Sequence, residues 1–218
     1  MNHFPALPYT EINIFLTELH SCIGMAARAV EFAILTAARS GEVRGATWEE
    51  IDLEARMWTI PAERMKIKRE HNVPLSDTAV RLLEALPQYE GNNHVFPAER
   101  VQVLSDMALT EAVRRMHEKK LAADGRGWID PKQNNRIITV HGFRSTFGDW
   151  AGDLTDYPYE VRQHAIAHDL PNKSDGAYFR SSQFIKRIGL MTDWARYCET
   201  VQAAKGDNVV SIRKRKAE

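Results

Sequence analysis

The stretch GMAARAVEFAILTAAR, residues 24–39, constrains the fold more than any other part of the sequence. It is rich in alanine and carries few charges on its core side. Both properties predict a helix that is more buried than its neighbours. Such a helix needs other elements to cover it, so the pattern in the rest of the chain decides the fold class.

Apolar residues at helical spacing recur along most of the remaining chain. Further helices are predicted over residues 10–21, 76–86, 106–121, 142–152 and 159–166, and over a segment with Phe184, Ile188, Met191, Trp194, Ala195 and Cys198 on one stripe. Thr10 and Ser76 are suited to cap the first two of these helices, and Pro87 stops the second.

Two short strand-like runs, residues 57–61 and 71–76, flank a basic connector. They predict a small hairpin, or a three-stranded sheet with the segment near Trp48. Residues 122–136 are polar and rich in Gly, Asn and Asp, and they predict a loop. We therefore expect one mostly helical α+β domain with a small antiparallel sheet near its N-terminal third.

The overall composition limits the class of protein. The chain has 218 residues, enough for one domain with a proper core, and its 29 basic residues balance 29 acidic ones. This balance argues mildly against a simple nucleic-acid-binding module, although the distribution of charge matters more than its total. Cys22 and Cys198 stand far apart, which favours a reduced intracellular protein. We see no membrane-spanning run and no signal peptide, so we expect a cytoplasmic protein.

Four segments place charged or titratable side chains inside otherwise structural patterns. They are TAARSGEVRG with Arg39, RMKIKRE with Lys66, TVHGFRSTFGDWAG with His141 and Arg144, and RQHAIAHDLPNKSDGAYFRSS with His164, His168, Tyr178 and Arg180. Each has an ordinary structural explanation; for Arg39 it is a cation at the end of the apolar helix, which the helix dipole favours. His141 and Arg144, three residues apart, share one helix face.

His164 and His168 have the spacing of two zinc ligands on one helix face. However, Ala165 follows the first histidine where a metalloprotease motif has its catalytic glutamate. Asp169 follows the second histidine directly rather than at a ligand distance. We therefore expect no metal at this pair.

Taken together and in this order, the segments resemble the catalytic domain of the tyrosine recombinases, and most closely the prophage integrases of the P4 type. The resemblance runs from HFPALPY to WARYC and rests on ILTAARSGEVRGATWEEID, MWTIPAERMKIKREHNVPLS, TVHGFRSTFGDWA, AIAHDLPNK and AYFRSSQFIKRIGLMTDWARYC. It implies a tyrosine-recombinase catalytic domain over residues 1–204, followed by a basic, disordered tail over residues 205–218. Family members carry N-terminal DNA-binding domains ahead of this one, so we expect weak DNA affinity from the catalytic part alone.

The resemblance also implies the activity. The family cuts double-stranded DNA through a 3′-phosphotyrosyl link, releases a 5′-hydroxyl, and uses no metal, ATP or other cofactor. We expect the chain to integrate or excise a prophage or genomic island in the bacterial cytoplasm. Its expected partners are the DNA attachment sites, further copies of itself in a tetramer on DNA, and accessory DNA-bending or directionality factors, with no membrane involved.

Residue roles follow from the matching positions. Tyr178 would be the nucleophile, and His141 would accept its proton. Arg39 and Arg144 would bind the scissile phosphate, and His168 would hydrogen-bond it. Lys66 would protonate the leaving 5′-oxygen. Planar guanidinium groups suit phosphate oxygens better than lysine does, and a phenol with a pKa near 10 needs a base to take its proton. Glu42, one turn after Arg39, is expected to hold that arginine in place.

Several points stay open. Ala167 stands where many relatives have glycine, and Gly148 lies inside a predicted helix where close relatives often have a charged residue. Competing residues are Lys68 and Arg69 for the role of Lys66, and Tyr157, Tyr159 and Tyr197 for that of Tyr178. A type IB topoisomerase shares this chemistry, and a non-catalytic DNA-binding remnant would share the fold.

Overall fold

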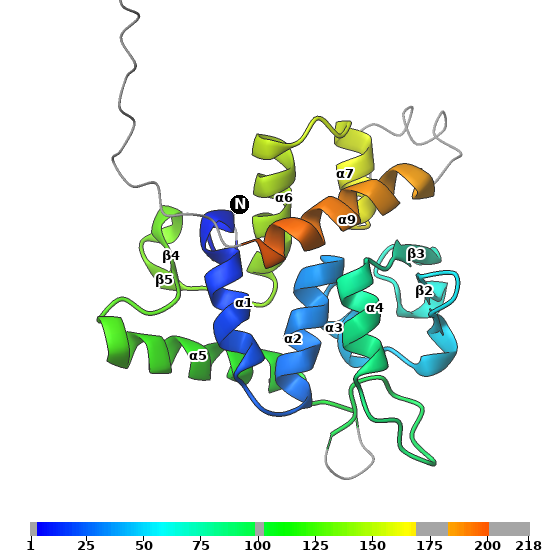
Figure 1. The fold of residues 1–218 in the computed structure, drawn as a ribbon, viewed down its shortest axis with the longest axis horizontal. Helices are drawn as coiled ribbons and strands as arrows, with labels where there is room; N and C mark the ends of the chain where they lie inside the picture. The colour runs from blue at the N-terminus through cyan, green and yellow to red at the C-terminus, as the bar shows by residue number, and fades with distance from the viewer. Residues whose placement is uncertain (1–3, 99–102, 169–182, 201–218) are drawn as a thin grey trace, which may run out of the picture.

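The computed structural model of the protein describes residues 4–98, 103–168 and 183–200. In this part of the chain, helix α2 (Met25–Thr36) lies between the other helices (Figure 1). It packs against α1, α3, α4, α5, α6 and α9, and almost every residue from Ala27 to Thr36 is buried. Because alanine is small, neighbouring helices can approach this helix closely. The buried helix predicted over residues 24–39 is confirmed, although it ends earlier.

The helices around α2 agree with the predicted ones within a few residues. They are α1 (Ile12–His20), α4 (Asp77–Glu84), α5 (Ala108–Asp124), α6 (Gly142–Leu154), α7 (Tyr159–Ala165) and α9 (Phe184–Glu199), with a one-turn η1 (Tyr9–Glu11) ahead of α1. The predicted cap at Ser76 is confirmed, since its hydroxyl accepts a hydrogen bond from the backbone N–H of Ala79 at 3.3 Å. Five-residue α3 (Ser40–Arg44) was not predicted as a separate helix.

The apolar stripe of α9 differs from the predicted one. Met191, Trp194 and Cys198 are buried as expected, but Ile188 is 45% exposed. Arg187 takes the inward position instead and is only 1% exposed. Its place four residues before Met191 fits the helical repeat, so this arginine continues the inward face where an apolar residue was expected.

The three-stranded version of the predicted sheet is confirmed. Its strands are β1 (Ile51–Asp52), β2 (Met57–Ile60) and β3 (His71–Pro74), antiparallel in the order β1-β2-β3, with the one-turn η2 (Trp48–Glu50) ahead of β1. Trp58 of β2 pairs with Val73 of β3, and its ring lies 5.2 Å from that of Phe32 on α2. The segment between β2 and β3, residues 61–70, is called the hairpin connector below. It contains the one-turn η3 (Ala62–Arg64).

The prediction of a plain loop over residues 122–136 is wrong. Helix α5 continues to Asp124 and ends at Gly125, which has φ of +73°. A second antiparallel pair follows, β4 (Ile129–Asp130) and β5 (Arg136–Ile137), around the short η4 (Pro131–Gln133). Strands of two residues are too short to show an alternating pattern, so no pattern in the sequence predicts them.

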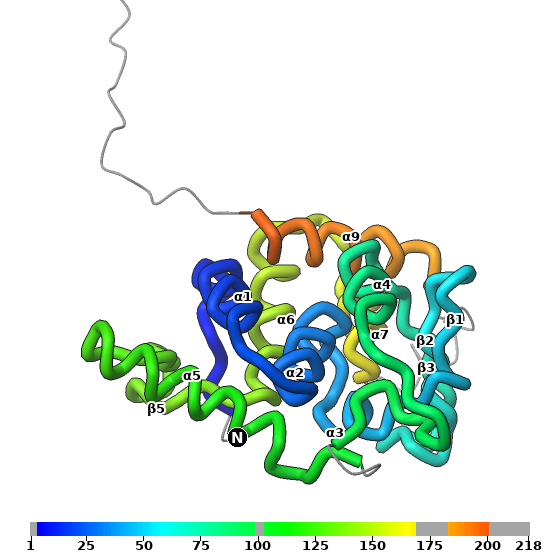
Figure 2. Tube along the Cα trace, turned by 60° about the horizontal axis from the view of Figure 1, so that its bottom comes forward, coloured from blue at the N-terminus to red at the C-terminus, as the bar shows by residue number. Residues whose placement is uncertain are grey.

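The two sheets lie at opposite ends of the molecule, with α2 between them in both views (Figures 1 and 2). Helix α9 crosses from α6 toward the three-stranded sheet and contacts β3. None of the helices in the described ranges is long and apolar enough to cross a membrane.

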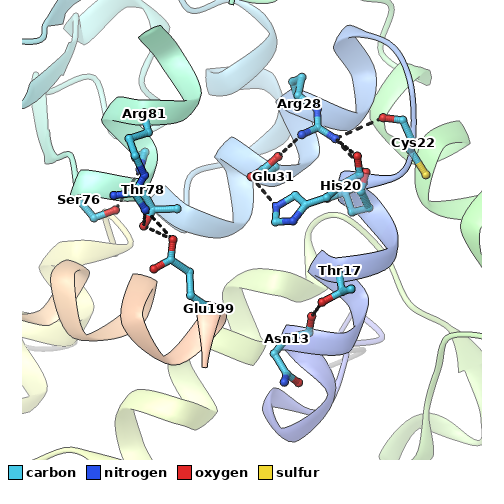
Figure 3. A network of polar contacts seen from close by, with 12 residues as sticks. Asn13, Thr17, His20, Cys22, Arg28, Glu31, Ser76, Thr78, Arg81 and Glu199 are labelled. Carbon is cyan, nitrogen blue, oxygen red and sulfur yellow. Dashed lines mark hydrogen bonds and ion pairs between the residues drawn. The ribbon is translucent and has the colours of Figure 1, made fainter. Parts of the chain in front are cut away.

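Two polar clusters join helices across this core (Figure 3). Arg28 of α2 bonds Glu31 at 2.7 Å and donates to the carbonyls of Leu19 and Cys22 at the end of α1. Such carbonyls lack partners within their own helix. Glu199, the last residue of α9, accepts hydrogen bonds from the side chains of Thr78 and Arg81 on α4 (Figure 3).

Candidate active site

Arg39 lies in the turn between α2 and α3, not at the end of a helix as the sequence indicated. Helix α2 stops at Thr36 because Ala37 adopts the left-handed conformation, with φ of +50°. Arg39 is extended and precedes α3. Glu42 holds it twice: one carboxylate oxygen lies 2.7 Å from Nη1 of Arg39, and the other accepts the Arg39 backbone N–H at 2.8 Å. The guanidinium is thereby fixed in orientation.

Arg144 lies in the first turn of α6 and is 5% exposed. Its Nη1 donates to the carbonyl of Ala37 at 2.7 Å, and its Nη2 donates to the carbonyl of Ile166. These carbonyls belong to the C-terminal ends of α2 and α7, where the helix dipole favours a cation. The buried Nε of Arg144 has no hydrogen-bond partner in the described ranges.

The two arginines lie side by side. Nη2 of Arg39 donates to the carbonyl of Ala167 at 3.2 Å, next to the Ile166 carbonyl that Arg144 binds. Burial and the charge of Arg39 lower the pKa of Arg144 to about 10, and Glu42 partly opposes this effect. Guanidinium groups are cations that hold planar sets of donors toward anions, so the two side chains together form a site for an anion.

His141 immediately precedes α6, and its ring lies 4.4 Å from that of Phe4. Burial lowers the pKa of His141, and the charges of Arg144, Arg39 and Lys66 lower it further. The imidazole is therefore neutral at neutral pH and able to accept a proton. The sequence predicts that His141 and Arg144 share one helix face. In the structure the charge of Arg144 acts on the His141 ring, which agrees with that prediction.

Gly142 is needed for a close approach rather than for a bend. A Cβ atom at this position would lie 1.9 Å from the carbonyl oxygen of Pro5. The same N-terminal segment carries Phe4, which contacts His141, and Pro5 also accepts the Thr139 backbone N–H at 3.0 Å. Only glycine lets this segment pass so close to the start of α6.

Lys66 is exposed on the hairpin connector, between buried Met65 and half-buried Ile67. Its charge acts on His141, whereas that of Arg69 acts on His164. Lys68 has φ of +52° and its Nζ lies 3.5 Å from the carbonyl of Glu63. Of the three competing cations of the connector, Lys66 is thus the one whose charge acts on His141.

Arg64 fixes the base of the hairpin connector and was not singled out by the sequence pattern. It forms an ion pair with Glu50 and donates to the backbone carbonyl of Glu42. A Cβ at Gly45 would lie 2.8 Å from its guanidinium, so glycine there leaves room for it. The connector is therefore tied to α3, which orients Arg39.

His168 is exposed and follows Ala167, which has φ of +47°. Its Nδ1 lies 3.2 Å from Oε1 of Gln163. The proposed nucleophile Tyr178 lies outside the described residues, as do Arg180 and the tail 205–218. His164, the other member of the histidine pair, has its pKa lowered by burial and by the charges of Arg187 and Arg69.

His71, the first residue of β3, is a site residue that the sequence pattern missed. Burial and the charges of Arg187, Arg144 and Arg39 lower its pKa to about 3. The only signal in the sequence is that a histidine opens the otherwise uncharged strand segment HNVPLS. That signal does not reveal which distant residues surround the ring.

The arrangement determines what the site can bind. Arg39 and Arg144 form a pair of cations with Glu42 beside them, and the charges of this pair and of Lys66 all act on His141. No group of three His, Cys, Asp or Glu side chains in the described ranges is placed to hold a metal ion. Anions such as a phosphodiester fit this charge, and the neutral imidazole of His141 lies beside the anion site as a proton acceptor.

Comparison with known proteins gives the family context. A family model described as the phage integrase family matches residues 7–169. The integrase of Enterobacteria phage P4 is 31% identical over 209 residues, which cover 88% of this chain and 44% of that protein. Prophage integrase IntA of Escherichia coli (strain K12) is 32% identical over 192 residues, 86% of this chain and 42% of that protein. The chain thus spans less than half the length of these two relatives.

Solved structures agree in fold. The integrase from mycobacterium phage Brujita has a TM-score of 0.59 at 14% identity, covering 93% of this chain and 64% of that one. The lambda integrase catalytic core gives 0.53 at 17% identity, with 75% and 96% covered. A lambda integrase tetramer bound to a Holliday junction gives 0.54 at 17% identity, with 79% and 50% covered. The expected tyrosine-recombinase fold is confirmed.

Proposed function

Because the chain belongs to the phage integrase family, we propose that it is the catalytic domain of a site-specific DNA recombinase. It cuts and rejoins DNA strands through a 3′-phosphotyrosyl intermediate, and so integrates or excises a prophage or genomic island. It acts on DNA in the bacterial cytoplasm.

One observation carries this proposal: the guanidinium groups of Arg39 and Arg144 are held beside each other by the adjacent carbonyls of Ala167 and Ile166. In the transition state of attack on a phosphodiester, the nonbridging oxygens gain negative charge. Two oriented guanidinium groups stabilise that charge, and they need no reorganisation at the moment of reaction. In the proposed reaction these two guanidinium groups supply the positive charge, and no metal ion or nucleotide takes part.

In the proposed reaction, two proton transfers accompany the exchange of one bond at phosphorus for another. The phenol oxygen of Tyr178 attacks the phosphorus and its proton passes to the neutral imidazole of His141. The bond from phosphorus to the 5′-oxygen breaks, and Lys66 donates a proton to that oxygen. His168 hydrogen-bonds the phosphate. The reverse attack by a 5′-hydroxyl of another strand restores the phosphodiester, and no energy source is consumed because the covalent link conserves the bond.

Two of the three competing tyrosines are less suited to attack. The hydroxyl of Tyr157 is bound to the carboxylate of Asp193 at 2.9 Å, and burial together with that carboxylate raises its pKa. Burial also raises the pKa of Tyr197, whose ring packs against Trp150 and Trp194. A raised pKa makes the phenolate harder to form, which supports the assignment of the nucleophile to Tyr178.

The proposed partners are double-stranded DNA at attachment sites and further copies of this chain, together with accessory DNA-bending or directionality factors. The tetramer of lambda integrase on a Holliday junction supports the proposal that four copies assemble on DNA. We expect a monomer in the absence of DNA. Sedimentation velocity without DNA, showing a stable tetramer, would contradict this expectation.

Covalent capture tests the function. The protein is mixed at low salt with randomised nicked duplexes whose cut strand loses a short end, in the presence of EDTA, and the denatured products are separated on a gel. We expect a protein–DNA adduct from the wild-type chain and none from Tyr178→Phe. Tyr159→Phe is the matched control, because Tyr159 is an exposed tyrosine on α7, and it should form the adduct normally.

The other outcomes separate the alternatives. If a folded wild-type chain binds DNA but yields no adduct from any duplex, the proposal is wrong and a non-catalytic DNA-binding role is favoured. If it relaxes supercoiled plasmid but never exchanges strands between duplexes, the chain acts as a type IB topoisomerase. An adduct that persists in Tyr178→Phe would contradict the assignment of the nucleophile.

A further inference from the structure

Arg187 is a buried cation on helix α9 that the proposed reaction does not use. Its side chain is only 1% exposed, and burial lowers its pKa to about 10. Removing a guanidinium from water is costly unless hydrogen bonds replace the lost hydration. An apolar side chain would suit the inward face of α9 without this cost. A buried arginine here therefore indicates a contact that an apolar side chain could not make.

That contact is with strand β3, against which α9 packs. Nη1 of Arg187 donates to the backbone carbonyl of Asn72 at 2.8 Å. Because β3 is an edge strand of the three-stranded sheet, some of its backbone groups have no partner within the sheet. The guanidinium also lies 5.5 Å from the centre of the Phe184 ring, one turn earlier on α9, which favours one orientation of the arginine. Arg187 thus joins α9 to the edge of the sheet.

Asn72 lies where the hairpin connector, residues 61–70, runs into the sheet. It is the second residue of β3 and pairs with Thr59 of β2. Near the other end of the connector, the half-buried Arg64 donates to the carbonyl of Glu42 on α3. One arginine therefore ties the connector to α3 near its start, and another ties the chain to α9 just after its end. Lys66 lies between these two contacts.

The two helices that hold the connector adjoin other residues of the proposed reaction. Helix α3 begins directly after Arg39. Helix α9 begins at Phe184, six residues after Tyr178 in the sequence. The segment that carries the proposed general acid is therefore bound to one helix next to a phosphate-binding arginine and to another that follows the proposed nucleophile.

We infer that Arg187 is a positioning residue of the proposed recombination reaction, which holds the end of the hairpin connector against α9 and thereby fixes the place of Lys66. Arg187 does not touch the DNA in this account and acts only through the connector. The inference rests on the proposed function for its catalytic consequence, whereas the hold on the connector does not depend on it.

Hydrogen–deuterium exchange tests the hold without using the reaction. Arg187→Met removes the donors, and replacing a buried charge by an apolar side chain of similar volume often leaves a protein as stable or more stable. We nevertheless expect this variant to raise amide exchange in residues 65–72 about tenfold or more, because a hydrogen bond from a charged group is lost. Arg187→Lys keeps a charged donor and should restore part of the protection. Exchange in β4 and β5, at the opposite end of the molecule, should not change.

Met191→Ala is the matched control on the same face of α9. Met191 is buried one turn after Arg187, and its side chain has no hydrogen-bond donor. Its truncation should lower the melting temperature without raising exchange selectively in residues 65–72. If Arg187→Met leaves exchange in these residues unchanged, or changes it only as Met191→Ala does, the inference is wrong.

A change of leaving group tests the catalytic consequence. A duplex recovered by covalent capture is made with sulfur in place of the 5′-oxygen at the cleaved bond. A thiol has a pKa of about 8.5, so the sulfur leaves as a thiolate without a proton from Lys66. We expect Arg187→Met to slow adduct formation about tenfold on the ordinary duplex and less than about twofold on the sulfur duplex. Lys66→Met should show the same selective rescue.

The outcomes separate the inference from the proposed function. If the sulfur duplex rescues Lys66→Met but not Arg187→Met, Arg187 does not act through Lys66 and the inference is overturned. Absence of an adduct from the wild-type chain, or no rescue of Lys66→Met, would contradict the proposed function instead. The exchange result would then decide the inference alone.

Discussion

At the scale of one residue, Arg144 is a buried side chain whose donors are only partly used. Its two Nη atoms are bound to the ends of α2 and α7, and its buried Nε has no partner in the described residues. A lysine has one point charge and cannot reproduce this planar set of donors. We predict that Arg144→Lys lowers the rate of adduct formation at saturating DNA by about 100-fold or more, the typical cost of one lost transition-state donor.

The control for this prediction is Arg114→Lys. Arg114 lies on the exposed side of α5 and pairs with Glu111 and Glu118. The control should react at the wild-type rate. Arg144→Lys with a rate near wild type would mean that the guanidinium does not contact the reacting phosphate.

Ala167 has an unfavourable backbone conformation. Its φ of +47° lies in the left-handed region, which costs about 1 kcal/mol or more for a residue with a Cβ. Glycine adopts this conformation freely. We predict that Ala167→Gly raises the free energy of unfolding by up to about 1 kcal/mol, because the relief of strain exceeds the added entropy of the unfolded chain. Urea denaturation measures this difference, and a loss of stability would contradict it.

Two of the three glycines of helix α6 have opposite requirements, which gives a prediction at the scale of an element. Nothing lies within 4 Å of a Cβ added at Gly148, whereas one added at Gly142 would collide with the carbonyl of Pro5 at 1.9 Å. We predict that Gly148→Ala stabilises the protein by about 1 kcal/mol through helix propensity. Gly142→Ala should destabilise it and displace the segment that carries Phe4.

Thermal unfolding of Gly148→Ala and Gly142→Ala, measured in parallel, checks these two predictions. The comparison is direct because both variants change glycine to alanine in the same helix. The prediction fails if the two melting temperatures shift in the same direction. The fluorescence or the amide hydrogen exchange of the N-terminal segment that carries Phe4 should change in Gly142→Ala and not in Gly148→Ala.

Some elements could be predicted from the sequence and others could not. The buried helix over residues 24–39 follows from its alanine-rich pattern, but its end at Ala37 is hidden, because no glycine or asparagine marks the left-handed residue. The strands of β4 and β5 are too short for any period. Arg64 binds the carbonyl of Glu42, and the charges of Arg187 and Arg144 act on His71, across long sequence separations that one sequence cannot reveal. Arg39, Lys66, His141 and Arg144 were identified through the resemblance, and spacing alone would not have joined them.

At the scale of the whole molecule, histidines with lowered pKa values make stability depend on pH. The pKa of His71 is lowered to about 3, and burial also lowers those of His141 and His164. An unfolded histidine has a pKa near 6.5. Between about pH 6.5 and about pH 3 the unfolded chain therefore binds a proton at residue 71 that the folded protein does not bind, so stability is present above this range and is lost as the pH falls.

His71→Gln isolates this contribution, because the carboxylates and the other histidines remain in both proteins. We predict that on going from about pH 7 to about pH 5 the wild type loses about 2 kcal/mol more free energy of unfolding than His71→Gln. Urea denaturation at the two pH values measures both losses. Equal losses in the two proteins would show that His71 is protonated in the folded state.

The central claim is that one tyrosine of this chain becomes covalently joined to DNA at the site formed by Arg39 and Arg144. The most direct test is to trap the adduct on a nicked duplex, digest the DNA and the protein, and locate the remaining nucleotide by mass spectrometry. We predict that the nucleotide is attached to Tyr178 and that the amount of this peptide falls in Arg144→Lys. A nucleotide on any other residue, or no modified peptide from a folded chain with DNA bound, would contradict the account.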